Sequence, residues 1–168
     1  MCKLLQLLLL STTNFGNSVH DFLGLNKPFF SPTSGEETTA QVGRTAYLTC
    51  EVYNLNNLSV SWVRGVDSHI LTVDRETFIS DSRFVSLNKK EKMSDVSTLS
   101  IREIQLQDEG SYECQVSSQD KIARTVILMV KEPQVKILGK TDIHVKEGSA
   151  VRLKCVIRNT FEAVPFVT

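Results

Sequence analysis

Residues 108–114 read DEGSYEC, and most of the fold can be worked out from this stretch. Tyr112 stands two residues before Cys114, while a second cysteine, Cys50, lies far upstream and is followed at a short distance by Trp62. A distant cysteine pair with a tryptophan after its first member and a tyrosine before its second is typical of two β-sheets joined by a disulfide. The pattern predicts that Cys50 and Cys114 are bonded and that Trp62 packs against them.

The same signature predicts an immunoglobulin-like β-sandwich, an all-β fold. Asp108, Gly110 and Tyr112 match its Asp-x-Gly-x-Tyr-x-Cys motif, and Asp108 is expected to pair with Arg83. A disulfide closing so long a loop stabilises a fold by roughly 4 kcal/mol in the chain-entropy description. The stretch between Trp62 and Arg83 leaves room for two extra strands, so a variable-type domain is predicted.

Short strands separated by turn signals follow one another along the chain at intervals of about 8–12 residues. No stretch of ten or more residues has the apolar period of an amphipathic helix. Residues 88–94, NKKEKMS, are interpreted as a solvated hairpin tip. The expected strands are 46–52, 59–64, 70–73, 77–80, 83–87, 99–104, 112–116 and 125–130.

The first residues, MCKLLQLLLL, resemble a secretory signal peptide, with a positive start and a short leucine block. We therefore expect a signal peptide at 1–18, an N-terminal arm at 19–33 and export to the cell surface or the extracellular space. A disordered leader or a misassigned first exon stays open as the alternative. The main domain is expected at 34–132, ending beside Pro133, which cannot continue a central strand.

The chain then begins a second copy of the pattern. The spacing of Gly43, Leu48 and Cys50 recurs at Gly148, Leu153 and Cys155, after an offset close to one domain of ~100 residues. Residues 133–168 are thus expected to be the first part of a second immunoglobulin domain. In that interpretation the chain is a fragment of a longer receptor, and Cys155 is unpaired because its partner lies further on.

Composition argues against several other functions. Nineteen basic and 19 acidic residues cancel, so a nucleic-acid binder is not expected. His20, His69 and His144 lie in separate segments without metal-ligand spacing, and no phosphate loop or nucleophile motif is present. No enzyme activity, catalytic residue, metal, cofactor or small-molecule substrate is expected.

Beyond the general signature, the chain resembles the arthropod Dpr (defective proboscis extension response) family over about residues 28–157. It departs from that family where Asp74 replaces a frequent glycine and where residues 76–79 are less aromatic. The resemblance implies a neuronal receptor that binds Dpr-interacting proteins, another immunoglobulin subfamily, through strands C, C′, C″, F and G in synaptic partner choice. The similar segments are 43–50, 60–64, 69–73, 80–84 and 112–117.

Strand alternation predicts apolar side chains on the outside of that sheet, and an exposed apolar patch usually marks a partner site. If Trp62 points inward, Val63 points outward, and one of Ile70 and Leu71 must also face out. A bulge that turns some of them inward, or cover by the N-terminal arm, remains the alternative. The predicted partner-binding face is Val63, Ile70, Leu71, Val73, Phe78, Gln115, Ile127 and Met129.

The opposite sheet is expected to be polar and solvated, with Thr49, Glu51, Thr98, Ser100 and Arg102 outside. Residues 57–59, Asn-Leu-Ser, form an N-glycosylation acceptor at Asn57 in the turn before the tryptophan strand.

Two other functions remain open. One is a homophilic neuronal adhesion protein of the lachesin or IgLON kind. The other is a structural spacer module of an intracellular muscle protein, which the leader, the acceptor site and the long cysteine spacing all disfavour.

Overall fold

The computed structural model describes residues 26–139 and 142–160, so the expected signal peptide at 1–18 lies outside the described part. That part is built almost entirely of strands, as predicted, with one 3-10 turn, η1, at Leu106–Asp108. The strands are β1 (Phe29–Phe30), β2 (Glu37–Gln41), β3 (Ala46–Tyr53), β4 (Val60–Arg64), β5 (His69–Val73), β6 (Glu76–Thr77), β7 (Phe84–Lys90), β8 (Ser94–Ile101), β9 (Gly110–Val116), β10 (Ile122–Lys131), β11 (Gln134–Leu138) and β12 (Lys154–Arg158).

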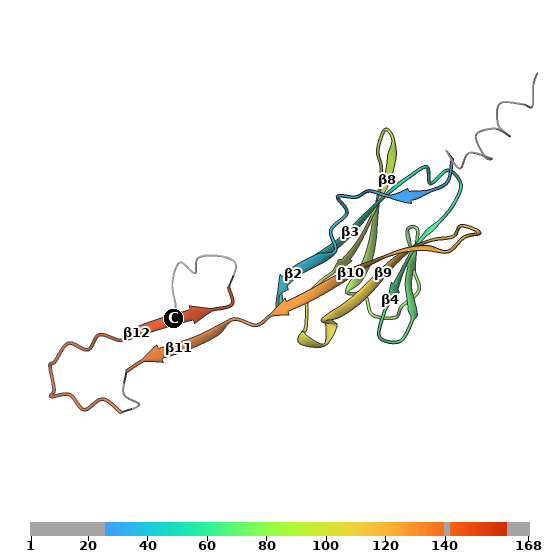
Figure 1. Ribbon diagram of the computed structural model, residues 1–168. Helices are drawn as coiled ribbons and strands as arrows, with labels where there is room; N and C mark the ends of the chain where they lie inside the picture. The colour runs from blue at the N-terminus through green and yellow to red at the C-terminus, as the bar shows by residue number, and fades with distance from the viewer. Residues whose placement is uncertain (1–25, 140–141, 161–168) are drawn as a thin grey trace, which may run out of the picture.

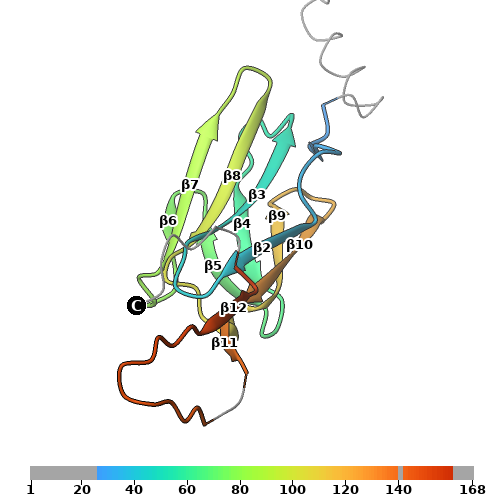
Figure 2. The same ribbon diagram turned by 90° about the vertical axis from the view of Figure 1, so that its left-hand side faces the viewer.

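Ten of these strands form a two-layer sandwich (Figures 1 and 2). One sheet has the order β1-β3-β8-β7 and the other β2-β10-β9-β4-β5-β6. In immunoglobulin nomenclature the strands β4, β5, β6, β9 and β10 correspond to C, C′, C″, F and G, so the six-stranded sheet carries the predicted partner-binding face.

The chain enters the sandwich by crossing from one sheet to the other. β1, which lies within the segment expected to be an arm, pairs antiparallel with β3, whereas β2 pairs parallel with β10. Phe29 stacks on Tyr53 with the ring centroids 5.2 Å apart, and Ser34 Oγ accepts a hydrogen bond from the backbone N–H of Glu51. These contacts make residues 29–41 part of both sheets.

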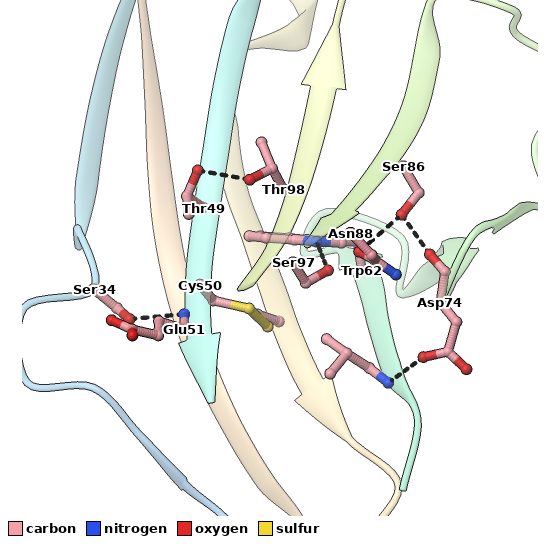
Figure 3. The surroundings of a disulfide bond; sticks show 12 residues. Ser34, Thr49, Cys50, Glu51, Trp62, Asp74, Ser86, Asn88, Ser97 and Thr98 are labelled. Carbon is pink, nitrogen blue, oxygen red and sulfur yellow. Dashed lines mark hydrogen bonds between the residues drawn. A yellow bond between two sulfur atoms is a disulfide. The ribbon is translucent and has the colours of Figure 1, made fainter. Parts of the chain in front are cut away.

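The core lies between the layers and is centred on the disulfide between Cys50 and Cys114, which confirms the predicted pairing (Figure 3). Trp62 is fully buried beside it, and its indole Nε1 donates a hydrogen bond to Ser97 Oγ at 3.1 Å. Inward-facing side chains of both sheets fill the space around this centre, among them Leu48, Val52, Leu71, Leu99, Ile101, Ile104, Val126 and Leu128.

One end of the sandwich is closed by contacts among Arg83, Asp108 and Tyr112. Arg83 Nη1 donates to Asp108 Oδ2 at 2.7 Å, as predicted, and the Tyr112 hydroxyl donates to the backbone carbonyl of Asp108 at 2.8 Å. Burial raises the pKa of Tyr112 to about 12. Hydrogen bonds from the side chain and the backbone N–H of Arg83 hold the pKa of the Asp81 carboxyl below its usual range.

Several strand boundaries differ from the expectation, among them those of β6, β7, β8 and β10. β7 continues to Lys90, so the expected hairpin tip at 88–94 shrinks to a turn in which the Glu91 N–H donates to the carbonyl of Ser94. Lysines can occupy this strand because β7 lies at the edge of its sheet, where charged side chains reach water. The expected strand at 77–80 is replaced by the two-residue β6, Glu76–Thr77.

Beyond the sandwich, β11 and β12 pair as a separate two-stranded sheet in which Ile137 lies opposite Cys155 (Figure 1). Cys155 is an exposed free thiol. Its strand lies at the same spacing from an upstream glycine as β3, which carries Cys50 in the sandwich.

Candidate partner-binding face

Strand pairing places the predicted residues in rows across the outside of the six-stranded sheet. One row joins Val73, Ser61, Gln115 and Ala123, because each is the direct partner of the next. The next row joins Ile70, Val63, Glu113 and Thr125 in the same way. Cys114 lies between these rows on β9 and points into the core, so both rows face outward.

Val63 lies in an outward row, as predicted, but the expectation that it is exposed is wrong. Its side chain is only 7% exposed, although it is not part of the central core cluster. Val63 pairs with Glu113 on one side and with Ile70 on the other. Val63 is therefore buried in the middle of the sheet, between two residues with longer side chains.

Leu71 is a second correction, because it belongs to the core and not to the face. The β4–β5 ladder shifts register by one residue: Trp62 pairs with Thr72, but Val63 pairs with Ile70. Such a bulge lets two successive residues of one strand face the same side. Leu71 and Thr72 are accordingly both buried between the sheets, while Ile70 is 49% exposed.

The other predicted residues remain on the surface. Ile127 and Phe78 are exposed, and Met129, Val73 and Gln115 are half-buried. Ile127 is the cross-strand partner of Ser111, and Met129 lies two residues along the same strand beside Thr39 of β2. Phe78 follows β6, where its N–H donates to the carbonyl of Leu71 at 2.8 Å. The patch therefore runs from β6 to β10.

Polar groups lie at the centre of this patch. Gln115 Nε2 donates to Glu113 Oε2 at 2.7 Å, and both side chains are half-buried. They line a hollow of about 330 Å³ together with Val63, Ile70 and Lys121. A carboxylate and an amide in this mostly polar hollow offer a partner both hydrogen-bond acceptors and donors.

The turn between β4 and β5 carries a charged pair at the margin of the patch. Arg64 Nη2 and Asp67 Oδ2 are 2.8 Å apart, and Arg64 Nε donates to Asp67 Oδ1. The hydrogen bonds from Arg64 lower the pKa of Asp67, and Asp67 in turn raises the pKa of Arg64. Gly65 follows within van der Waals range of Ser111, where a side chain would collide with the backbone of β9.

The opposite sheet is less polar than expected. Thr49, Glu51 and Thr98 lie on its outside as predicted, but Ser100 is buried, and Tyr47 and Leu87 are exposed beside them. The exposure of Tyr47 could have been predicted from the sequence, because Tyr47, Thr49 and Glu51 are alternate residues of one strand and so face the same side.

Asn57 lies in the exposed turn between β3 and β4, where the acceptor motif predicted it. The described part of the chain gathers no three His, Cys, Asp or Glu side chains into a metal-binding group. Nor does it contain a helix of the length and apolar character that crossing a membrane requires.

Comparison with known proteins identifies the family to which the chain belongs. The model of the immunoglobulin I-set domain matches residues 28–129. Lachesin of Schistocerca americana is 34% identical over 71% of this chain and 36% of its own length. Limbic system-associated membrane protein of Rattus norvegicus is 30% identical over 77% of this chain and 37% of its own. The chain thus spans a little over a third of these relatives.

Two solved structures show a similar arrangement. Dpr2 Ig1-Ig2, in complex with DIP-Theta Ig1-Ig3, gives a TM-score of 0.59 at 35% identity, covering 82% of this chain and 64% of that chain. Dpr11 IG1, bound to DIP-gamma, gives a TM-score of 0.53 at 48% identity, covering 56% of this chain and 97% of that chain. The family match, the buried tryptophan and disulfide, and these likenesses agree: the chain belongs to the immunoglobulin I-set family, whose relatives include cell-surface adhesion proteins.

Proposed function

We propose that this domain is a cell-surface recognition module that binds an immunoglobulin domain of a partner receptor through the outside of its six-stranded sheet. The observation that carries the proposal is the exposure of Ile70, Phe78 and Ile127 on one face around the Gln115–Glu113 pair. Exposed apolar side chains gathered around a few polar groups are typical of protein interfaces.

The comparisons support a heterophilic partner. The similar Dpr1, Dpr2 and Dpr11 structures are each of a complex with a DIP protein, and Dpr11 IG1 is the most similar of the three in sequence, at 48% identity. We therefore propose a DIP-like partner, and a role in the choice of synaptic partners between neurons, as the Dpr resemblance implies.

A second candidate is self-association through the same face. ZIG-8 IG1, which is 25% identical with a TM-score of 0.53, is described as a homodimer. Since the face carries both Lys121 and Glu113 around one hollow, two copies can also present opposite charges to each other.

A binding panel tests both candidates. The chain is produced through a secretory pathway and measured by surface plasmon resonance against DIP-like ectodomains, other neuronal immunoglobulin ectodomains and itself. Ile70→Asp and Ile127→Asp bury a charge in any complex using the face and should lower affinity at least tenfold.

Leu87→Asp is the matched control, since Leu87 is 48% exposed, almost the same as Ile70, but lies on the other sheet. Loss of binding in both face variants with an unchanged Leu87→Asp supports the proposal. Binding that is lost only in Leu87→Asp would assign the interface to the opposite sheet, and binding to itself alone would select the homophilic candidate.

A further inference from the structure

The turn that carries Asn57 is compact and open to solvent. The Leu58 N–H donates to the carbonyl of Leu55 at 3.0 Å, which leaves Asn57 at the exposed tip. Asn56 adopts a left-handed φ of 53°, and its Nδ2 donates to the carbonyl of Asn54 at 3.1 Å. Asn57 itself makes no hydrogen bond within the described residues, so its amide is available for modification.

A hollow of about 400 Å³ begins directly beside this turn. Both chain neighbours of Asn57, Asn56 and Leu58, line it. Leu55, Val60 and Val96 contribute further apolar surface. The volume is within the roughly 300–1,000 Å³ range of small-molecule sites.

The rest of the lining is charged and largely without partners. Arg75, Glu76, Lys90 and Asp95 line the hollow, and within residues 26–139 and 142–160 their side chains make no hydrogen bond or ion pair. Asp74 is different, because its Oδ1 accepts the N–H of Val60 at 2.9 Å and holds the neighbouring turn in place (Figure 3). The hollow therefore has an apolar base, surrounded by hydrogen-bond donors and acceptors that have no partner within the described residues. The hydrogen bond of Asp74 holds one side of it in place.

We propose that an N-linked glycan on Asn57 folds back over Leu58 and that its first sugars occupy this hollow. A pyranose ring has apolar C–H faces and a rim of hydroxyls, so it fits an apolar base with charged groups around it. The disulfide is characteristic of the exported compartment in which such glycans are attached.

Attachment needs a lipid-pyrophosphate oligosaccharide as donor. The Asn57 amide nitrogen forms a bond to the anomeric carbon of the first sugar, the bond from that carbon to the pyrophosphate oxygen breaks, and the amide gives up one proton. The proposal does not depend on the partner-binding face.

A second hollow, of about 380 Å³, lies on the other side of Leu58 and is lined by Ser118, Gln119 and Ile122. Leu58 lines both hollows, but Asn56 lines only the first. Since the turn contributes two residues to the first hollow and one to the second, we assign the glycan to the first.

The test uses the whole chain secreted from eukaryotic cells. Intact mass should show a glycan that disappears in Asn57→Gln and in Ser59→Ala. Its removal by peptide-N-glycosidase from the native protein should be about fivefold slower than from a reference glycan, because hydrogen bonds to the hollow hold the first sugars against the protein. The reference is Val66→Asn in the Asn57→Gln background, which creates an acceptor in the fully open β4–β5 turn.

Two further variants locate the sugars. The double variant Arg75→Ala, Glu76→Ala should raise the native removal rate at Asn57 toward the reference, and Gln119→Ala should leave it unchanged. An unmodified Asn57 in secreted, disulfide-bonded protein would overturn the proposal. So would equal removal rates at the two sites, or a rate that responds to Gln119→Ala and not to the double variant.

Discussion

Arg83 and Asp108 form a two-point ion pair across the closed end of the sandwich. Nη1 donates to Oδ2 at 2.7 Å and Nη2 to Oδ1 at 3.1 Å, and the two side chains are only 17% and 6% exposed. Arg83 reaches this position from the start of β7 and Asp108 from η1, so the pair ties together segments from the two sheets. Removing Arg83 leaves the Asp108 carboxylate buried without its cationic partner, whereas removing Asp108 leaves Arg83 paired with Asp81 alone.

We expect Asp108→Ala to lower the free energy of unfolding by about 3 kcal/mol, the lower end for breaking a buried pair, since Arg83 keeps Asp81 as a second partner. Urea unfolding followed by the fluorescence of Trp62, the only tryptophan, measures this. The control is Asp67→Ala, which breaks the exposed pair with Arg64 and should lower the free energy of unfolding far less, because solvent screens that pair. Equal losses in the two variants would contradict the ranking by burial.

Tyr112 predicts how stability changes at alkaline pH. Burial raises its pKa to about 12 in the folded protein, against about 10 for an exposed tyrosine. The folded state therefore holds the proton more tightly, and its stabilising contribution is complete below pH 10 and disappears as pH rises through 12. The change amounts to about 3 kcal/mol.

The measurement compares unfolding of the parent and of Tyr112→Phe between pH 9 and 12, both carrying Cys155→Ser to prevent thiolate attack on the disulfide. We expect the difference between the two curves to shrink by that amount over this window. A difference that stays constant with pH would show that the phenol ionises alike in the folded and unfolded states.

Ser97 accepts the only hydrogen bond of the buried Trp62 indole. Ser97→Ala leaves that N–H without an acceptor and should destabilise the domain by about 1–3 kcal/mol. Thr98→Ala is a matched comparison on the next residue, because its hydroxyl bonds Thr49 at the surface; a change below about 1 kcal/mol is expected there. Thermal unfolding of the two variants side by side decides the matter.

The bulge between β4 and β5 gives neighbouring residues different roles. Leu71→Ala empties a fully buried site and should cost about 2–5 kcal/mol, whereas Ile70→Ala should cost under about 1 kcal/mol. Ile70→Ala should instead weaken partner binding, which calorimetric titration with the ligand identified by the panel measures. If both variants destabilise alike, the ladder runs without a bulge.

The residues that could be predicted from sequence are those whose roles follow from local spacing. Trp62, Tyr112 and the two cysteines of the sandwich occupy positions that the fold requires relative to one another, and Asp108 follows from the same short motif. Their contacts were therefore within reach of sequence reasoning.

The errors arise where pairing between distant segments sets the outcome. Simple alternation exposes Val63, but this residue is buried between Ile70 and Glu113, its partners on two other strands. Alternation also cannot choose between Ile70 and Leu71, because the choice depends on a register shift against β4. Likewise, the pairing of β1 with β3 could not be predicted from local sequence patterns, because it depends on contacts with the distant residues Tyr53 and Glu51.

The parallel pairing of β2 with β10 has a mechanical consequence. The chain enters the six-stranded sheet at β2 and leaves it at β10. Five residue pairs join these two strands, from Ile127 opposite Glu37 to Lys131 opposite Gln41. Tension applied between the two ends of the domain pulls parallel strands in opposite directions along their length. Hydrogen bonds that run across the strands then share the force simultaneously and do not open one at a time. A domain with this geometry therefore resists being stretched along the direction of these two strands.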